Sequence, residues 1–224
     1  TTEGTAAAAR LVFGRNIFNS RNLTFEPNVN MATPPNYRLG PGDEVIIDVW
    51  GANEASMRKT ISPEGNIMVN LLGPVYLNGM TVAEANSFLK KEFSKIYSQV
   101  SGTNPESEVR LTLGQIRSIQ INVMGEVAVP GTYMLSSLST VFHALYRAGG
   151  VNNIGSLRSI RVMRGSNCIA DLDVYDYILK GKLLDDIRLM EGDVIIVPPY
   201  EKLVDISGKV KRPMYYEMKK NETL

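Results

Sequence analysis

Most hydrophobic residues of this chain fall in short runs with the character of β-strands. Ile121 and Val123 flank Asn122, which is the two-residue alternation of a strand buried on one face. The other runs are bounded by glycine, proline or asparagine. They cover residues 45–50, 57–61, 66–69, 74–77, 108–113, 160–164 and 167–172. We expect the segments Ser62–Gly65 and Gly165-Ser166 each to join two of these strands in a hairpin.

One long stretch has the spacing of a helix instead. Apolar residues recur at helical intervals over residues 82–97. Thr81 and Glu84 stand at its start as a capping box, in which each side chain satisfies a backbone N–H group of the first turn. The sequence therefore predicts a helix over residues 82–97.

Two shorter helices follow. One is expected over residues 141–148, capped by Ser139 or Thr140 and stopped by Gly149-Gly150. The other is expected over residues 174–180. Many short strands with a few helices between them predict an α+β fold made of small mixed-sheet modules.

The stretch Ile121–Met134 occurs a second time as Val204–Tyr216. It predicts a strand, a corner at Gly125, a second short strand over 126–129, and a turn at Pro130-Gly131 into a third strand. Proline presets φ in such a turn, and we expect Gly131 to supply a positive φ. Residues 83 positions apart match: Gly125 and Gly208, Val127 and Val210, Pro130 and Pro213, Tyr133 and Tyr216. A fixed spacing with matching turn residues indicates a repeated module.

These elements divide the chain into four parts. Residues 1–36 combine asparagine and proline with scattered apolar residues, so we expect an arm that lies on a folded body, its own or a neighbour's. Residues 37–114 form a first domain, 115–200 a second, and 201–224 the start of a second copy of the latter. Because this copy ends where its helix should begin, we expect the chain to be a piece of a longer protein with more repeats.

The composition is that of an ordinary folded protein, with 44% hydrophobic and 21% charged residues. The net charge of +1 gives no basis for nucleic-acid binding or for attraction to an anionic membrane surface. No run approaches the ~18 apolar residues of a membrane helix. The start of the chain lacks the basic and apolar segments of a signal peptide.

Few residues suit catalysis or metal binding. The single cysteine, Cys168, excludes a disulfide within the chain and a multi-cysteine metal site, and we expect a small core residue there. The single histidine, His143, shares a helix face with Arg147 and is expected to be exposed. Spacing alone leaves a Cys–His nucleophile pair open. We expect Asp185-Asp186 in a solvated loop, and we predict no catalytic residue, no metal and no cofactor.

The segment after the arm resembles the polysaccharide export domain. Residues 37–43, Tyr-Arg-Leu-Gly-Pro-Gly-Asp, match the opening motif of that family and lead into a strand, as the family pattern does. The turn at Glu64-Gly65, the segment Gly73–Val75 and the helix start at Thr81–Glu84 follow in the family's order. Glu64 stands where the family has aspartate.

The repeated stretch, with Ala148–Val151 and Glu191–Ile195, resembles the SLBB module, a β-grasp unit that holds soluble ligands elsewhere. Together the two resemblances cover nearly all of residues 37–224. They place the chain with the polysaccharide export protein family and imply an export domain followed by a β-grasp-like SLBB domain. Members of that family usually carry a lipid-bearing cysteine, and the best-known ones cross the outer membrane with a C-terminal amphipathic helix. We expect both features outside this chain.

The resemblance implies a non-enzymatic protein at the periplasmic face of the bacterial outer membrane, acting in capsule or exopolysaccharide export. It implies polysaccharide as the substrate, a homo-oligomeric ring as the assembly and an inner-membrane polysaccharide co-polymerase as a partner. The alternative is a saccharide- or small-ligand-binding β-grasp module without a channel role. An enzyme acting on carbohydrate would need paired carboxylates that the sequence does not present in a recognisable setting.

The family motifs supply the candidate site residues, to which we assign structural roles and at most weak contact with a ligand. They are Gly42, Asp43, Gly125, Pro130, Gly131, Tyr133, Gly149, Gly150, Gly192 and Asp193.

Overall fold

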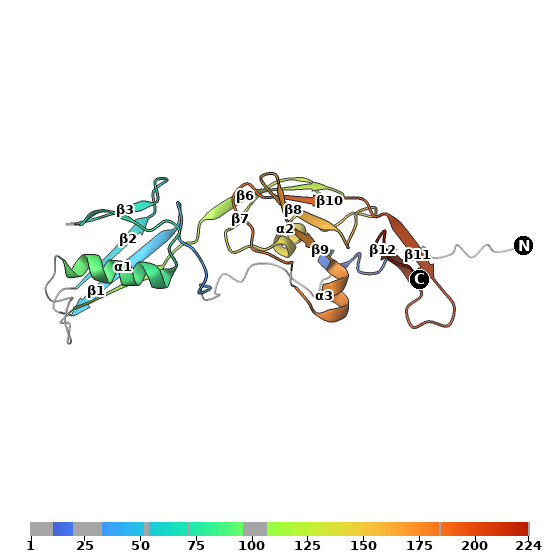
Figure 1. Cartoon of the computed structure of the whole chain (residues 1–224), viewed down its shortest axis with the longest axis horizontal. Coiled ribbons are helices and arrows are strands. Elements are labelled where there is room, and N and C mark those ends of the chain that lie inside the picture. Colours follow the sequence, from blue (N-terminus) through green and yellow to red (C-terminus); the bar gives the residue numbers. More distant parts are fainter. Residues whose placement is uncertain are drawn as a thin grey trace, which may run out of the picture. The chain divides into compact units, whose positions relative to one another are not determined.

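The computed structural model of the chain describes residues 11–19, 33–51, 54–70, 72–95, 107–183 and 185–223. These residues belong to two compact units, one within Asn28–Ser118 and one formed by Ile119–Leu224 with the N-terminal segment. Figure 1 labels their helices and strands. Each unit combines small sheets with packed helices, so the predicted α+β fold is confirmed.

The first unit contains a three-stranded antiparallel sheet of order β2-β1-β5, a separate hairpin and one helix. The sheet consists of β1 (Glu44–Gly51), β2 (Ala55–Thr60) and β5 (Ser107–Leu113), and the hairpin of β3 (Asn66–Val69) and β4 (Gly73–Tyr76). Val45 and Ile47 of β1 are fully buried, whereas Ile46 and Asp48 are half-buried. This alternation is the two-residue period of a strand that is buried on one face.

Helix α1 (Val82–Ser94) begins at the predicted capping box. The Thr81 hydroxyl accepts a hydrogen bond from the Glu84 N–H (3.2 Å), and the Glu84 carboxylate accepts one from the Thr81 N–H (2.8 Å). The helix packs on β5 through a buried face of Ala85, Leu89 and Phe93. The last two residues of the predicted helix, 96 and 97, lie outside the described residues.

The hairpin predicted around Ser62–Gly65 is wrong. The local turn is present, because the Gly65 N–H donates to the Ser62 carbonyl (2.8 Å). However, this turn joins strands of two different sheets, since β2 pairs with β1 and β3 pairs with β4. Turn residues set a local change of direction, whereas pairing depends on which neighbour buries a strand's apolar face.

The second unit is built on a five-stranded mixed sheet of order β7-β6-β10-β8-β9. Its strands are β6 (Ser118–Gly125), β7 (Gly131–Ser136), β8 (Ile160–Arg164), β9 (Asn167–Leu172) and β10 (Val194–Val197). β10 runs parallel to β6 and antiparallel to β8. The predicted hairpin around Gly165-Ser166 is confirmed as β8–β9. The helices of this unit are α2 (Val141–Arg147) and α3 (Val174–Lys180).

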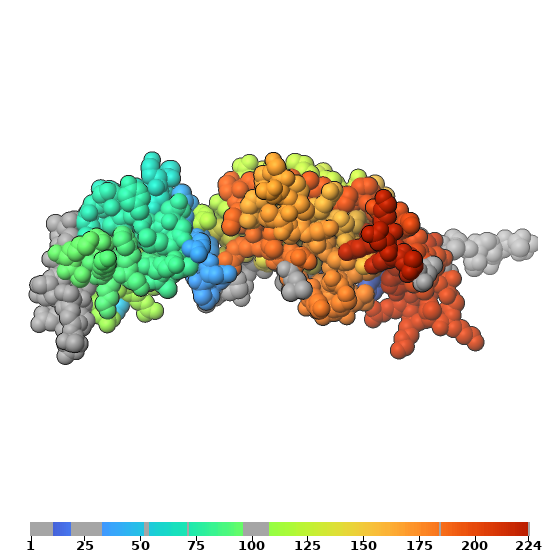
Figure 2. All heavy atoms as spheres, viewed as in Figure 1, coloured from blue at the N-terminus to red at the C-terminus, as the bar shows by residue number. Residues whose placement is uncertain are grey.

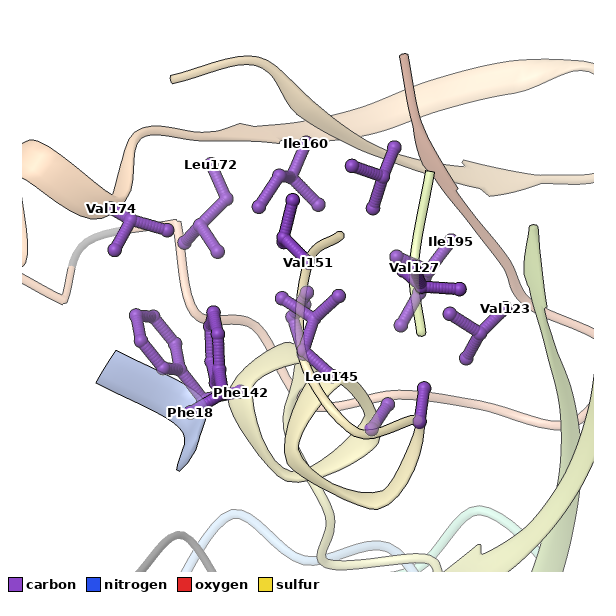
Figure 3. Packing of buried hydrophobic residues seen from close by; sticks show 14 of the residues in the cluster. Phe18, Val123, Val127, Phe142, Leu145, Val151, Ile160, Leu172, Val174 and Ile195 are labelled. Atoms are coloured by element: carbon purple, nitrogen blue, oxygen red, sulfur yellow. The ribbon is translucent and has the colours of Figure 1, made fainter. Parts of the chain in front are cut away.

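One face of this sheet and α2 enclose a hydrophobic core. Figure 3 shows side chains of three strands, Val123, Ile160 and Ile195, gathered near Leu145 of α2. All four are fully buried. Burial of an aliphatic side chain of this size contributes about 1.5–3 kcal/mol, so this cluster holds the helix on the sheet.

Helix α2 starts after Thr140 and is followed by Gly149-Gly150, as predicted. The two glycines have φ values of +77° and +82°, which only glycine adopts readily. The expectation that His143 is exposed is wrong. Its ring is half-buried, and Nδ1 accepts a hydrogen bond from the Thr140 N–H (2.9 Å). The imidazole folds back over the helix start and caps it instead of extending into solvent.

Four smaller expectations for this unit are also wrong. Residues 126–129 form no strand, and only Val127 makes an isolated bridge. Cys168 is exposed, because β9 is an outer strand and its first residues extend past the core. Gly131 begins β7 and has no positive φ. Asp186 is half-buried rather than solvated, since its carboxylate accepts from the Phe142 N–H at the start of α2 (2.9 Å).

The second copy of the repeat forms a hairpin of β11 (Lys202–Ile206) and β12 (Met214–Met218). Its corner matches that of the first copy: the Val127 N–H donates to the Gly125 carbonyl (3.0 Å), and the Val210 N–H donates to the Gly208 carbonyl (2.9 Å). Both glycines have a positive φ, +85° and +91°. The loop between β11 and β12 projects from its unit (Figures 1 and 2).

Residues 11–19 of the arm lie on the second unit, so this part of the arm covers a body of its own chain. Val12 forms a parallel bridge with Tyr215 of β12. Phe13 stacks on Tyr216 with ring centroids 5.1 Å apart. Phe18, in the short 3-10 helix η1 (Ile17–Asn19), lies beside Phe142 of α2, with ring centroids 5.4 Å apart (Figure 3).

Candidate functional site

Two of the predicted site residues, Gly42 and Asp43, form a turn closed by a buried carboxylate. Asp43 is fully buried. Its oxygens accept hydrogen bonds from the Tyr37 hydroxyl (2.7 Å) and from the Gly40 N–H (2.9 Å). They also accept from Arg117, both from its N–H (2.9 Å) and from its Nη1 (2.6 Å). The carboxylate therefore ties the start of β1 to the segment that follows β5.

Gly192 and Asp193 form the same kind of turn in the second unit. Asp193 is also fully buried, and it accepts from the Met190 N–H (2.8 Å). Arg164 donates to it in a bidentate pair, with Nε and Nη2 each at 2.8 Å. The hydrogen bonds with Asp193 raise the pKa of Arg164 more than partial burial lowers it.

The two turns have matching surroundings. Arg38, five residues before Asp43, forms an antiparallel bridge with Thr81, the cap of α1, and Arg188 forms one with Thr140, the cap of α2. Protein groups already occupy both carboxylates, and each holds the start of a strand in place: Asp43 joins β1 to the segment after β5, and Asp193 joins β10 to β8. A ligand would have to displace an arginine to reach either one.

Gly125 is required by a close approach of two backbones. A Cβ atom at this position would lie 2.1 Å from the Val197 carbonyl oxygen. The close approach that the sequence predicts at this glycine is therefore present, between the ends of two parallel strands.

The remaining predicted site residues are spread over the ends of β7 and α2. Pro130 and Gly131 precede and begin β7, and Gly149 and Gly150 follow α2. The hydroxyl of Tyr133 donates to the Val129 carbonyl (2.5 Å) and so closes the turn before β7. The structure does not bring the ten predicted residues together around one cavity.

A polar cleft of about 580 Å³ lies elsewhere in the second unit, between the segments next to the sheet and the end of β12. Its lining includes no predicted site residue. The residues that line it are Ser156, Arg158, Ser159, Arg161, Asp171, Pro198, Pro199, Glu201, Glu217, Met218, Lys219, Lys220, Asn221 and Glu222. We treat this cleft as the candidate functional site.

A buried carboxylate forms one wall of the cleft. Glu217 of β12 is only 5% exposed. It accepts a hydrogen bond from the Ser156 hydroxyl and one from the Leu157 N–H (2.7 Å). The Ser156 oxygen in turn accepts from the Arg158 and Ser159 N–H groups (3.1 and 3.0 Å). This network joins the second repeat to the turn before β8.

Arg158 forms a second wall and is held by several partners. Its guanidinium pairs with Asp173 (3.2 Å) and with Glu222 (2.5 Å), and it donates to the Glu217 carbonyl (3.1 Å). The guanidinium also lies over the Tyr175 ring, 5.0 Å from its centroid. Partial burial would lower the pKa of Arg158, but the bonds to Glu222 and Asp173 outweigh it and raise the pKa.

Arg15, a buried arginine of the arm, lies within the electrostatic influence of Glu217. Nη1 of Arg15 donates to the carbonyls of Asn152 (2.7 Å) and Gly155 (2.5 Å). Burial lowers the pKa of Arg15, while the charge of Glu217 opposes this change. Arm, first repeat and second repeat thus meet around one charged cluster.

The cleft offers hydroxyl, ammonium, guanidinium and carboxylate groups, and no aromatic ring is among its lining residues. Such groups suit hydrogen bonding to a polyhydroxylated or charged chain. They do not form a metal site, because no group of three or more His, Cys, Asp or Glu side chains lies together as metal ligands within the described ranges.

In the part of the chain that the structure describes, no helix is both long and apolar enough to cross a membrane.

Sequence reasoning missed the cleft residues because their partners are far apart. Glu217 lies 61 positions from Ser156, and Glu222 lies 64 positions from Arg158. One signal was available in the repeat itself, since Glu217 matches Met134 at the spacing of 83. A charged residue at an otherwise matching strand position indicates a polar partner that the first copy lacks.

Comparison with known proteins gives two matches in the order of the two units. The model of the polysaccharide biosynthesis/export protein family matches residues 31–112, and that of the SLBB domain matches residues 120–197. Two curated relatives, both described as polysialic acid transport protein KpsD of Escherichia coli, are 28% identical over 211 residues. The match covers 94% of this chain but 36% of each relative, so the chain spans about a third of their length.

Proposed function

Because the chain belongs to the polysaccharide biosynthesis/export family, with an export domain followed by an SLBB domain, we propose that it is a section of a bacterial conduit for capsule or exopolysaccharide. The order of the modules carries this proposal. The match to the export family ends at residue 112, the SLBB match begins at residue 120, and β11–β12 repeats the start of the SLBB module. The family is one of export and transport proteins, in agreement with the prediction that the chain is not an enzyme.

We assign the parts of the chain as follows. Residues 1–36 are the arm, 37–114 the export domain, 115–200 the SLBB domain and 201–224 the start of a second SLBB repeat. The matching hydrogen bonds at Gly125 and Gly208 support the last assignment.

The cargo of the whole protein is a polysaccharide. The two relatives are named as polysialic acid transport proteins, and these names support a polysaccharide cargo here. The hydroxyl and charged groups of the cleft suit contact with sugar hydroxyls. A transport path needs binding strong enough for the polymer to enter and weak enough for it to move on, as in ion channels.

The whole protein assembles as a homo-oligomeric ring at the periplasmic face of the outer membrane and contacts an inner-membrane polysaccharide co-polymerase. Modules with open sheet edges suit such an assembly, because edge strands pair readily with other chains. Head-to-tail contacts between identical copies close into rings when the rotation permits.

The experiment is deletion of the gene in the source bacterium, followed by measurement of polysaccharide at the cell surface and inside the cell. We expect surface polysaccharide to be lost, internal polymer to accumulate, and a plasmid copy of the gene to restore export. Unchanged surface polysaccharide in the deletion strain would contradict the export role. A change in polymer length with unchanged export would favour an enzyme.

The polar cleft favours a second candidate, a saccharide-binding module without a channel role. Its volume of about 580 Å³ lies within the usual range of ligand pockets. Calorimetric titration of this chain with neutral and acidic oligosaccharides tests it, with Lys220→Ala in the cleft and Lys182→Ala outside it as a matched pair. Saturable binding that only K220A weakens, in a chain that stays monomeric, would favour this candidate.

A further inference from the structure

In the second copy of the repeat, the outer edge of the last strand is covered by the N-terminal arm. There β12 lies between β11 and arm residues 11–13. The Tyr215 N–H donates to the Leu11 carbonyl (3.1 Å), and the Tyr215 carbonyl accepts from the Phe13 N–H (2.9 Å). The next outward amide of β12, that of Glu217, donates to the Tyr175 hydroxyl (2.9 Å). Both outward amides of this strand are therefore satisfied.

The same edge is open in the first copy. The strand that matches β12 is β7, and within the described part of the chain no strand lies beyond it in the five-stranded sheet. Thr132 and Met134 match Tyr215 and Glu217 at the spacing of 83. Since backbone groups alternate in direction along a strand, Thr132 and Met134 direct their N–H and C=O groups out of the sheet edge. Thr132 is exposed, and Met134 is 61% exposed.

The matching tyrosines of the two copies, Tyr216 and Tyr133, also differ in whether another aromatic ring covers them. Tyr216 is covered by Phe13, with ring centroids 5.1 Å apart. Tyr133 makes the matching hydroxyl bond to the residue four positions before it. No aromatic ring of the described residues stacks on Tyr133, and its side chain is half-buried.

β7 also lacks the charged residues that keep an edge strand from pairing. Lysine and other charges on outer strands prevent unwanted association. The other outer strands of the two larger sheets carry them: Arg58 and Lys59 on β2, Glu108 and Arg110 on β5, and Asp171 on β9. The sequence of β7, Gly-Thr-Tyr-Met-Leu-Ser, has none.

From these observations we propose that the outer edge of β7 binds an extended segment of a second copy of this chain. The segment runs parallel to β7, as residues 11–13 run parallel to β12, and it covers Tyr133 with an apolar side chain. The choice of a second copy rests on the ring assembly proposed above. The contact joins unlike surfaces of two copies and is therefore of the type that forms rings.

Hydrogen exchange measured over a range of protein concentrations, together with sedimentation equilibrium, tests this contact. The peptide 213–218 serves as an internal reference, because its Tyr215 and Glu217 amides are already bonded within one copy. We expect it to be protected at every concentration. In the peptide 130–136 we expect the amides of Thr132 and Met134 to exchange fast in dilute solution and to become protected as the chain self-associates.

Variants separate the edge from the rest of the sheet. Thr132→Pro removes the outward amide and should raise the dissociation constant of self-association about tenfold. Thr132→Lys adds an edge charge at an exposed position and gives the same result if the proline variant fails to fold. Gln120→Lys adds the same charge to an exposed position of β6, inside the sheet, and should leave association unchanged.

Association that Thr132→Lys does not weaken, or a chain that is monomeric at every concentration, would overturn the contact. So would protection of residues 130–136 that does not depend on concentration, because a segment of the same copy would then cover the edge. Each of these results leaves the export role untouched, since loss of surface polysaccharide in the deletion strain is measured independently.

Discussion

Tyr133 and Tyr216 lie 83 positions apart, and each donates its hydroxyl to the carbonyl of the residue four positions before it. The acceptors are Val129 and Arg212, at 2.5 and 3.2 Å. The two acceptors share no side-chain chemistry, so the bond is a property of the repeated backbone. Each tyrosine closes the turn that leads into its strand. Because the acceptor is a backbone carbonyl, the side chain of the accepting residue can differ between copies of the module.

The two corner glycines of the repeat should differ in their tolerance of alanine. Gly208 has open space where a Cβ would lie, and alanine there would meet only the cost of a positive φ, about 1–2 kcal/mol. At Gly125 the Cβ would also meet the Val197 carbonyl oxygen at 2.1 Å. We expect Gly125→Ala to lower the free energy of unfolding by at least ~2 kcal/mol more than Gly208→Ala. Urea denaturation of both variants measures the difference, and equal losses would contradict the close approach.

The buried aspartates should matter more than the exposed ion pair between Glu44 of β1 and Arg58 of β2. Asp43→Asn and Asp193→Asn each replace an acceptor by an amide that faces donors, and each should cost about 2–3 kcal/mol of unfolding free energy. Glu44→Gln removes the pair with Arg58, whose side chain is 69% exposed, and should cost ~1 kcal/mol or less. Thermal denaturation of the three variants compares them, and a loss at Glu44 as large as at Asp43 would contradict the assignment.

Much of this fold follows from signals that lie close together in the sequence. The capping box of Thr81 and Glu84, the glycines after α2 and the hairpin at Gly165-Ser166 involve residues within a few positions of one another. The repeat could also be predicted, because its turn residues recur at a fixed spacing. Such features depend on local backbone preferences that tertiary packing leaves unchanged.

The rest depends on contacts between distant residues. The motif marked Asp43 as important, but its partner Arg117 lies 74 positions away. The turn residues of Ser62–Gly65 predict a hairpin, yet β2 pairs with β1, the strand that precedes it in the chain. The helical spacing places His143 on an exposed face, although its ring bends back and accepts a hydrogen bond from the Thr140 N–H. The cleft around Glu217 is lined by residues from separate segments, 156–161, 171, 198–201 and 217–222, and no sequence motif links these segments.

His143 should make the stability of the second unit depend on pH. Burial lowers the pKa of its imidazole, although the charge of Asp186 opposes this change. Its neutral Nδ1 accepts a hydrogen bond from the Thr140 N–H, which a protonated ring could not do. The unfolded chain therefore binds the proton more readily than the folded one. The stabilisation is complete above the unfolded pKa of about 6.5 and is lost as the pH falls from there through the folded pKa.

His143→Gln tests this dependence, because glutamine at this position forms an ordinary capping box with Thr140. We expect the variant to keep its stability between pH 8 and pH 5, whereas the natural chain loses part of its own. His143→Ala should be less stable at every pH, since the Thr140 amide then has no acceptor. Urea midpoints at several pH values measure this. An equal loss of stability with falling pH in the natural chain and in H143Q would assign the effect to groups other than His143. Asp186 is not one of them, because burial raises its pKa and its protonation therefore adds stability as the pH falls.

Glu217 should decide whether the second repeat stays attached to the first. Its carboxylate satisfies the Ser156 hydroxyl and the Leu157 amide, and an amide nitrogen in its place would face these donors. We expect Glu217→Gln to cost about 2 kcal/mol and to increase hydrogen exchange in residues 214–218 before the five-stranded sheet opens. Glu201→Gln changes another carboxylate of the same cleft, which is exposed, and should stay within about 0.5 kcal/mol of the natural chain. If both variants behave alike, the buried carboxylate of Glu217 does not hold the second repeat to the first.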